Sequence, residues 1–72
     1  MPILIAPLNQ ELTVMKITGG DKAMKHLREL GIVPQMKITL LSQEASGVIL
    51  RVGDSRLAID NDIARAILVE AL

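Results

Sequence analysis

Few side chains in this sequence could bind a transition metal. His26 is the only histidine, and the chain has no cysteine. A tight zinc or iron site needs three or four suitable ligands, so one histidine is too few. Asp60 and Asp62 are close in sequence, but their position favours capping and the first turn of a short helix. We assign no metal ligand, and any iron contact would be weak, shared with another chain or made by carboxylates.

Catalytic and nucleotide-binding patterns are also missing. Ser42, Ser46 and Ser55 fall in predicted turns or loops, and one histidine offers no Ser-His-Asp arrangement. Gly19 and Gly20 precede a predicted helix, but the phosphate-binding loop pattern, with its second glycine followed by Lys and Ser or Thr, is absent. We assign no catalytic residue and no cofactor, and we do not expect an enzyme.

Charged residues gather on a helix predicted over residues 21–30. The apolar residues that share one arc of its helical wheel are Ala23, Met24, Leu27 and Leu30. The charged residues off this arc are Lys22, Lys25, Arg28 and Glu29. Three of these four are cationic, so the face could guide the protein to an acidic patch on a partner. The alternative is a face that is only solvated.

Apolar residues outside the helix supply the second part of the predicted docking surface. The candidates are Ile3, Leu4, Ile5, Val33 and Met36. Several of them would instead fill the core, because a chain this small has few apolar residues to spare. The partner-binding residues predicted from the sequence are therefore Lys22, Lys25, Arg28, Glu29 and Val33.

The segments that must position these residues are short and mostly β. Alternation and β-branched content predict strands over residues 12–18, 36–40, 48–52, 56–59 and 67–69. Asp60 and Asn61 are competent N-caps for a helical turn before the last strand. Five short strands are too few for a sandwich, so we predict a mainly β fold, a small and partly open barrel with the helix covering one end.

Glycine and proline mark the predicted turns. Gly31 stands where a left-handed residue would close the helix, and Pro34 presets the φ of a turn's second position. Gly47 ends the loop before the third strand, and Gly53 begins the turn before the fourth. A type II turn needs positive φ at its third position, so a type I turn would better tolerate Gln35 after Pro34.

Composition limits the classes of partner. The chain has 72 residues, enough for one compact domain over 1–72, and eight basic side chains balance eight acidic ones. With no Phe, Tyr or Trp it offers no stacking platform for single-stranded nucleic acid. Zero cysteines fit a reducing cytosol, and the apolar run over residues 2–8 is too short to span a bilayer. We expect a soluble, unexported protein with no nucleic-acid partner and no membrane insertion.

Residues 27–34, Leu-Arg-Glu-Leu-Gly-Ile-Val-Pro, resemble the core motif of FeoA proteins, in which two leucines and a glycine precede an aliphatic residue and a proline. Further residues at that family's spacing are Ile38, Gly47, 48–52, 57–59, Ala64 and 67–69. The resemblance covers roughly residues 12–69. It departs at Gln35, where the family often has glycine, and at residues 9–11, which lack the usual early glycine.

The resemblance implies an SH3-like barrel that works in the cytoplasm with FeoB, the large membrane GTPase and ferrous iron permease. Similar domains end DtxR-type metal-dependent repressors, but we expect this chain to stand alone, since it has no room for their other domains. Transition-metal binding is implied only at the level of the family. The alternatives are a generic SH3-like adaptor or nucleic-acid-binding module and, third, a small enzyme; weak self-association is left open.

Overall fold

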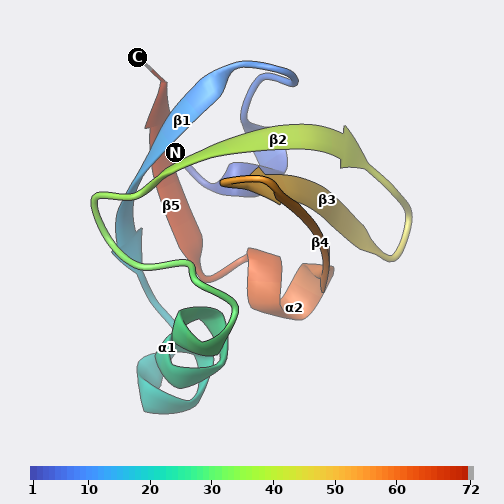
Figure 1. Cartoon of the computed structure of the whole chain (residues 1–72). Coiled ribbons are helices and arrows are strands. Elements are labelled where there is room, and N and C mark those ends of the chain that lie inside the picture. The colour runs from blue at the N-terminus through green and yellow to red at the C-terminus, as the bar shows by residue number, and fades with distance from the viewer. Residues whose placement is uncertain (72) are drawn as a thin grey trace.

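The structure, a computed structural model, describes residues 1–71 (Figure 1). Its elements, in chain order, are the 3-10 helix η1 (Ile3–Ile5), β1 (Glu11–Ile17), α1 (Gly20–Glu29), β2 (Lys37–Gln43), β3 (Gly47–Val52), β4 (Ser55–Asp60), α2 (Asn61–Ala64) and β5 (Ile67–Ala71). The predicted mainly β, SH3-like fold is confirmed, with one α-helix after the first strand and a helical turn before the last. The strands are longer than predicted at several ends, because backbone pairing continues past the apolar alternation.

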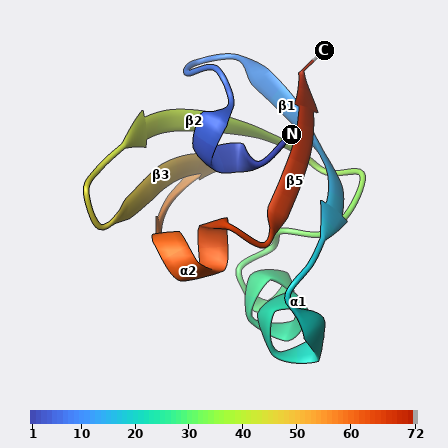
Figure 2. The ribbon, with the colours of Figure 1, turned by 180° about the vertical axis from the view of Figure 1, so that it is seen from behind.

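The five strands form one antiparallel sheet in the order β4-β3-β2-β1-β5. Register shifts in β1, between Val14 and Lys16, and in β2, between Leu40 and Ser42, interrupt the pairing. Such bulges increase the local bend and twist of a strand. The sheet curls around its core without closing, since β4 and β5 are its two ends in the hydrogen-bonded order (Figure 2).

The N-terminal segment covers the free edge of β5, an arrangement that the sequence analysis did not predict. Val69 N donates to Met1 O at 2.7 Å, and Met1 N donates to Val69 O at 2.8 Å. Pro2 forms a bridge with Leu68. This pairing turns η1 back across the sheet and buries Ile3 completely. A strand edge that is paired in this way is not available to other chains.

The core is aliphatic throughout. Its inward-facing strand residues are Leu12, Val14, Ile17, Ile38, Leu40, Val48, Leu50, Val52, Ile59, Ile67 and Val69. Ile3, Leu27 and Ile32 add fully buried side chains from outside the strands. No polar or charged side chain is buried within residues 1–71. The hydrophobic effect, with no buried polar network, therefore selects the register of every strand.

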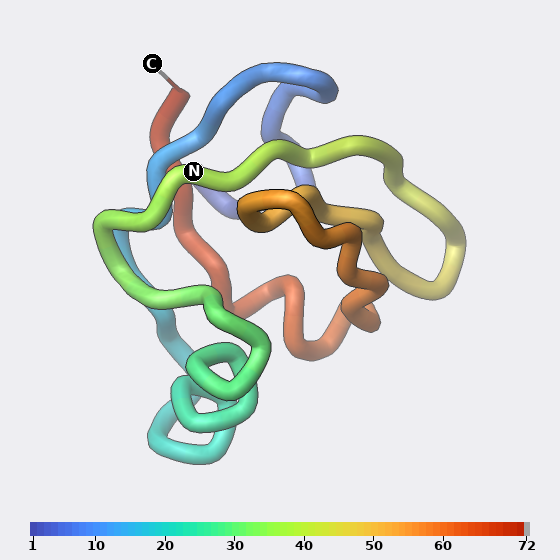
Figure 3. The backbone as a smooth tube through the Cα atoms, viewed as in Figure 1, coloured from blue at the N-terminus to red at the C-terminus, as the bar shows by residue number. Residues whose placement is uncertain are grey.

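Only part of the predicted apolar arc of α1 reaches the core. Leu27 is fully buried and Ala23 and Leu30 are half-buried, but Met24 is 37% exposed. The helix lies beyond one end of the sheet (Figure 1, Figure 3), and Leu27, in its last turn, is its fully buried residue. The helical wheel predicts burial for every apolar residue of the arc, but in the folded protein only the residues nearest the sheet are buried.

A Schellman motif ends α1 and holds it against the core. Gly31 N donates to Arg28 O at 2.9 Å, and Ile32 N donates to Leu27 O at 2.8 Å. Gly31 has a φ of 89°, the left-handed conformation that this motif requires. Leu27 and Ile32, at the hydrophobic positions of the motif, are both fully buried. The reversal at Gly31 thereby directs the chain back to the sheet.

The turn after the helix corrects one expectation. Met36 N donates to Val33 O at 3.2 Å, which makes Pro34 and Gln35 the two central residues. Gln35 has a φ of 77°, so the turn is of type II and not the type I turn that glutamine was expected to favour. Flanking bonds hold the strained residue in place, because Gln35 N donates to Val14 O at 2.7 Å and Val14 N donates to Met36 O at 2.8 Å.

The remaining turns are short. Val52 pairs with Ser55, so Gly53 is the first residue of a two-residue turn between β3 and β4. Gly47 is buried opposite Asp60, where β3 begins. A Cβ added to Gly47 would lie 2.3 Å from the carbonyl oxygen of Ile59. Glycine is needed at Gly47 because the backbone of β4 occupies the space of a side chain.

Substituting Gly31 should weaken the end of α1. A Cβ in the left-handed conformation costs about 1 kcal/mol, and a β-branched residue costs more. Gly31→Val should therefore lower Tm by roughly 5–10 °C in thermal melts followed by circular dichroism. Gly31→Asn is the matched control, since asparagine tolerates positive φ, and it should recover part of the loss. A Gly31→Val protein that melts like the wild type would show that the cap contributes little.

Gly47→Ala should destabilise the protein by a different mechanism. The new methyl group meets the backbone of β4, which can yield only if β3 and β4 separate. Overpacking of this kind costs about 1–3 kcal/mol. We expect a larger fall in Tm for Gly47→Ala than for Gly31→Ala, whose Cβ would meet only Val52 Cγ1, at 4.0 Å. Ser46→Ala, at the exposed neighbouring position, should melt like the wild type, and the reverse ranking would contradict the assigned clash.

Candidate protein-binding surfaces

The exposed side of α1 carries the four charged residues predicted to bind a partner. Lys22, Lys25, Arg28 and Glu29 are all exposed and recur at intervals of one helical turn. Asp21 lies on the same side, so the face holds three cations and two carboxylates. The face therefore has an excess of one positive charge, against two when only the four predicted residues are counted.

The charges of α1 are not engaged in ion pairs. Within residues 1–71 the ion pairs join Lys37 to Glu11 at 3.8 Å and Arg65 to Asp62 at 2.5 Å, both away from α1. The basic groups of the helix are therefore open to solvent and to ligands. Charges of this kind act mainly on the rate of encounter with a partner, and salt screens them.

Val33 is the apolar residue that accompanies this face. It is 38% exposed and follows Ile32, at the start of the turn that is bonded to β1. Of the other apolar candidates, Ile3 is fully buried, Leu4 and Met36 are half-buried, and Ile5 is 72% exposed. Ile5 belongs to η1, which is not part of the α1 segment. Val33 is therefore the exposed apolar candidate that lies close after the end of α1. We refer to Lys22, Lys25, Arg28, Glu29 and Val33 as the α1 face.

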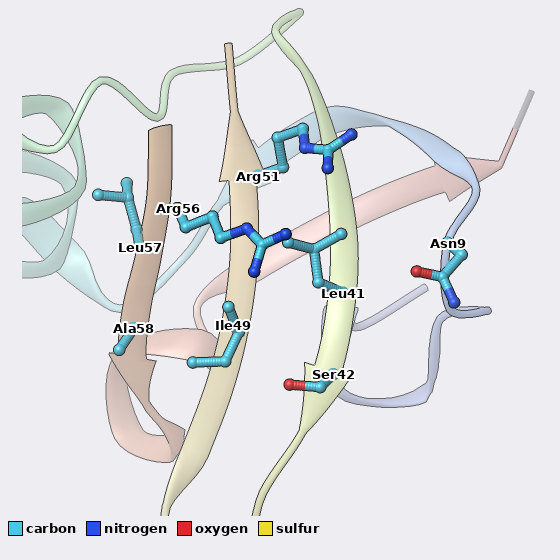
Figure 4. A pocket seen from close by; sticks show the side chains of 8 residues that line it. All are labelled: Asn9, Leu41, Ser42, Ile49, Arg51, Arg56, Leu57 and Ala58. Atoms are coloured by element: carbon cyan, nitrogen blue, oxygen red, sulfur yellow. The ribbon is translucent and has the colours of Figure 1, made fainter. Parts of the chain in front are cut away.

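A second surface, which sequence reasoning missed, lies on the outer side of the sheet. An open groove of about 670 Å³ is lined by Asn9, Leu41, Ser42, Ile49, Arg51, Arg56, Leu57 and Ala58 (Figure 4). We call it the arginine groove. A signal for it was present, because Arg51 and Arg56 flank the turn at Gly53 symmetrically, and a hairpin with that two-residue turn places them opposite each other.

No candidate metal centre is found in the part of the chain described. Residues 1–71 contain no cluster of three or more His, Cys, Asp or Glu side chains that could hold a metal ion. His26 is exposed on α1. Asp60 Oδ1 accepts a hydrogen bond from Ile63 N at 2.9 Å as the N-cap of α2, and Asp62 pairs with Arg65. Across the same residues, none of the helices has both the length and the apolar content to span a bilayer.

Comparison with protein families decides the classification. A family model of the FeoA domain matches residues 1–71. The chain belongs to the FeoA domain family. This family is associated with ferrous iron transport, consists of small accessory domains and is not a known family of enzymes. The resemblance inferred from residues 27–34 is thus confirmed.

Solved structures share the fold over the full length of the chain. The crystal structure of an iron uptake regulatory protein (FeoA) is 28% identical, with a TM-score of 0.89 over 99% of this chain and 95% of that one. The FeoA-like protein from Clostridium acetobutylicum is 22% identical, with a TM-score of 0.86 over 100% of this chain and 86% of that one. ScaR with bound Zn²⁺ is 16% identical, with a TM-score of 0.92 over 100% of this chain but 37% of that one. A search of curated protein sequences found no match.

The protein should not bind ferrous iron or zinc tightly. Within residues 1–71, His26 belongs to no cluster of three or more possible metal ligands, Asp60 caps α2, and Asp62 pairs with Arg65. Anaerobic calorimetry with Fe²⁺, and calorimetry with Zn²⁺, should show no stoichiometric submicromolar binding to the monomer. His26→Ala should leave any weak binding unchanged. Tight binding that His26→Ala abolishes would contradict this prediction and would make His26 a metal ligand.

Proposed function

We propose that this FeoA-domain protein is a small cytoplasmic accessory protein of bacterial ferrous iron uptake that binds and modulates an FeoB-type membrane GTPase and permease. The match of the FeoA family model to residues 1–71 is the observation that carries the proposal. The protein acts through contact and has no catalytic step of its own.

The α1 face is the proposed contact surface. Its lysine and arginine side chains are exposed and free of ion pairs within residues 1–71, and Val33 adds an apolar contact next to the turn. Its shape is fixed, because the Schellman motif and the bonds to Val14 anchor α1 and the turn to the sheet. A fixed surface loses little conformational entropy on binding, which favours a specific complex.

Reversing one charge on this face tests the proposal. Arg28→Glu changes an exposed side chain and leaves the buried Leu27 untouched, so the protein should fold normally. Binding to detergent-solubilised FeoB-type permease, measured by pull-down and by biolayer interferometry, should weaken about tenfold at low salt. The difference from the wild type should shrink as salt is raised, because exposed charges are screened.

Arg65→Glu is the matched control for Arg28→Glu. It makes the same charge reversal at an exposed residue directly after α2, outside the α1 face. Its lost pair with Asp62 is exposed and contributes little to stability. Arg65→Glu should bind the permease like the wild type. Unchanged binding by Arg28→Glu would remove the α1 face from the proposal, and no binding by the wild type would remove the permease as partner.

A further inference from the structure

The arginine groove contains two like charges directly opposite each other. Antiparallel pairing places Arg51 on β3 opposite Arg56 on β4. Figure 4 shows both side chains on the same side of the sheet, extended across β3 toward β2, near Leu41 and Ile49. Both residues are exposed, and Arg51 lies between the buried Leu50 and Val52 on β3. Two guanidinium groups thus share one open site.

Neither arginine forms an ion pair within residues 1–71. The cross-strand row that contains them continues through Thr39 on β2 to Glu11 on β1. Glu11 is the carboxylate of this row, but it lies two strands from Arg51 and pairs with Lys37 at 3.8 Å. Asp54, in the turn between the two arginines, forms no ion pair with either of them within residues 1–71.

This arrangement costs stability. Like charges directly opposite each other on neighbouring strands destabilise a sheet, and a neutral polar residue at either position would avoid the cost. The chain as a whole carries eight basic and eight acidic side chains, so the local excess does not follow from its composition. A destabilising charge pair at an open groove is explained if a bound anionic group offsets the repulsion.

We propose that the arginine groove binds an acidic, extended segment of a partner protein, in which a carboxylate side chain is followed two residues later by an aliphatic one. The paired guanidinium groups of Arg51 and Arg56 hold the carboxylate by charge-assisted hydrogen bonds. The apolar wall formed by Leu41, Ile49 and Ala58 holds the aliphatic side chain two residues away, because side chains at this spacing point to the same side of an extended segment. This contact is separate from the α1 face, whose residues do not line the groove.

The lining of the groove distinguishes this ligand from other anions. Inorganic phosphate would use the arginines but leave the apolar wall unoccupied. Nucleic acid is disfavoured, because the chain has no aromatic side chain for stacking and no net positive charge. An acidic peptide with aliphatic side chains complements both parts of the site. Asn9 and Ser42, at the far side of the groove, can bond to its backbone (Figure 4).

The test uses a fluorescently labelled peptide with the repeat Glu-Ser-Leu-Ser, which places glutamate and leucine on the same face of an extended chain. Fluorescence anisotropy gives the affinity and amide NMR shifts give the location. Addition of the peptide should shift amides that line the arginine groove and leave those of α1 in place. The affinity should fall about tenfold in Arg51→Gln/Arg56→Gln and should weaken with salt. Arg65→Gln, the same change outside the groove, should bind normally, and a glutamine-for-glutamate peptide should not bind.

Stability measurements separate binding from folding. Because repulsion is removed, Arg51→Gln/Arg56→Gln should melt at or above the wild-type Tm. If the double variant folds poorly, Arg56→Gln alone, in the edge strand β4, replaces it. This single variant should weaken binding about threefold, which is half of the tenfold effect on a free-energy scale. The proposal is overturned if the variants bind the peptide normally or if the shifted amides belong to α1. It is also overturned if inorganic phosphate or a leucine-free acidic peptide binds equally well, since a simple anion site would then suffice.

Discussion

Leu27 and Ile32 are both fully buried, and they stand on either side of the glycine that ends α1. Their burial, together with the two backbone bonds of the Schellman motif, attaches the helix to the end of the sheet. The turn at Pro34 and Gln35 is then bonded to β1 through Val14. Without this attachment α1 would have too few core contacts to keep one orientation, and its charged face would have no fixed relation to the barrel.

The two faces of the curled sheet have different roles. The inner face is filled by aliphatic side chains alone, so it supplies stability and register without any buried polar bond. The outer face of β2, β3 and β4 carries Arg51 and Arg56 at positions that do not contribute to the core. Their substitution is expected to alter binding without loss of the fold, and the same holds for the exposed charges of α1.

The two candidate surfaces differ in how their charges are balanced. On α1, Asp21 and Glu29 accompany the three cations, so that face suits a partner with mixed charges. In the arginine groove the cations face each other and the nearest carboxylate of the row, Glu11, is paired elsewhere. Because the two arginines repel each other, a carboxylate bound in the arginine groove would relieve that repulsion as well as form its own hydrogen bonds. A small domain with zero formal net charge can therefore carry two separate surfaces for charged partners.

The strands, the helix and the family could be predicted from local patterns in the sequence. Period-two alternation selects the inward residues, and the motif over residues 27–34 carries both the helix end and the FeoA resemblance. The positive φ of Gln35, the complete burial of Ile3 and the exposure of Met24 could not be predicted in this way. Each of these depends on contacts with segments distant in the chain, such as the bonds of Gln35 and Met36 to Val14. The pairing of Arg51 with Arg56 follows from the two-residue turn at Gly53, but only the tertiary structure brought Asn9, from a distant segment of the chain, to the same groove.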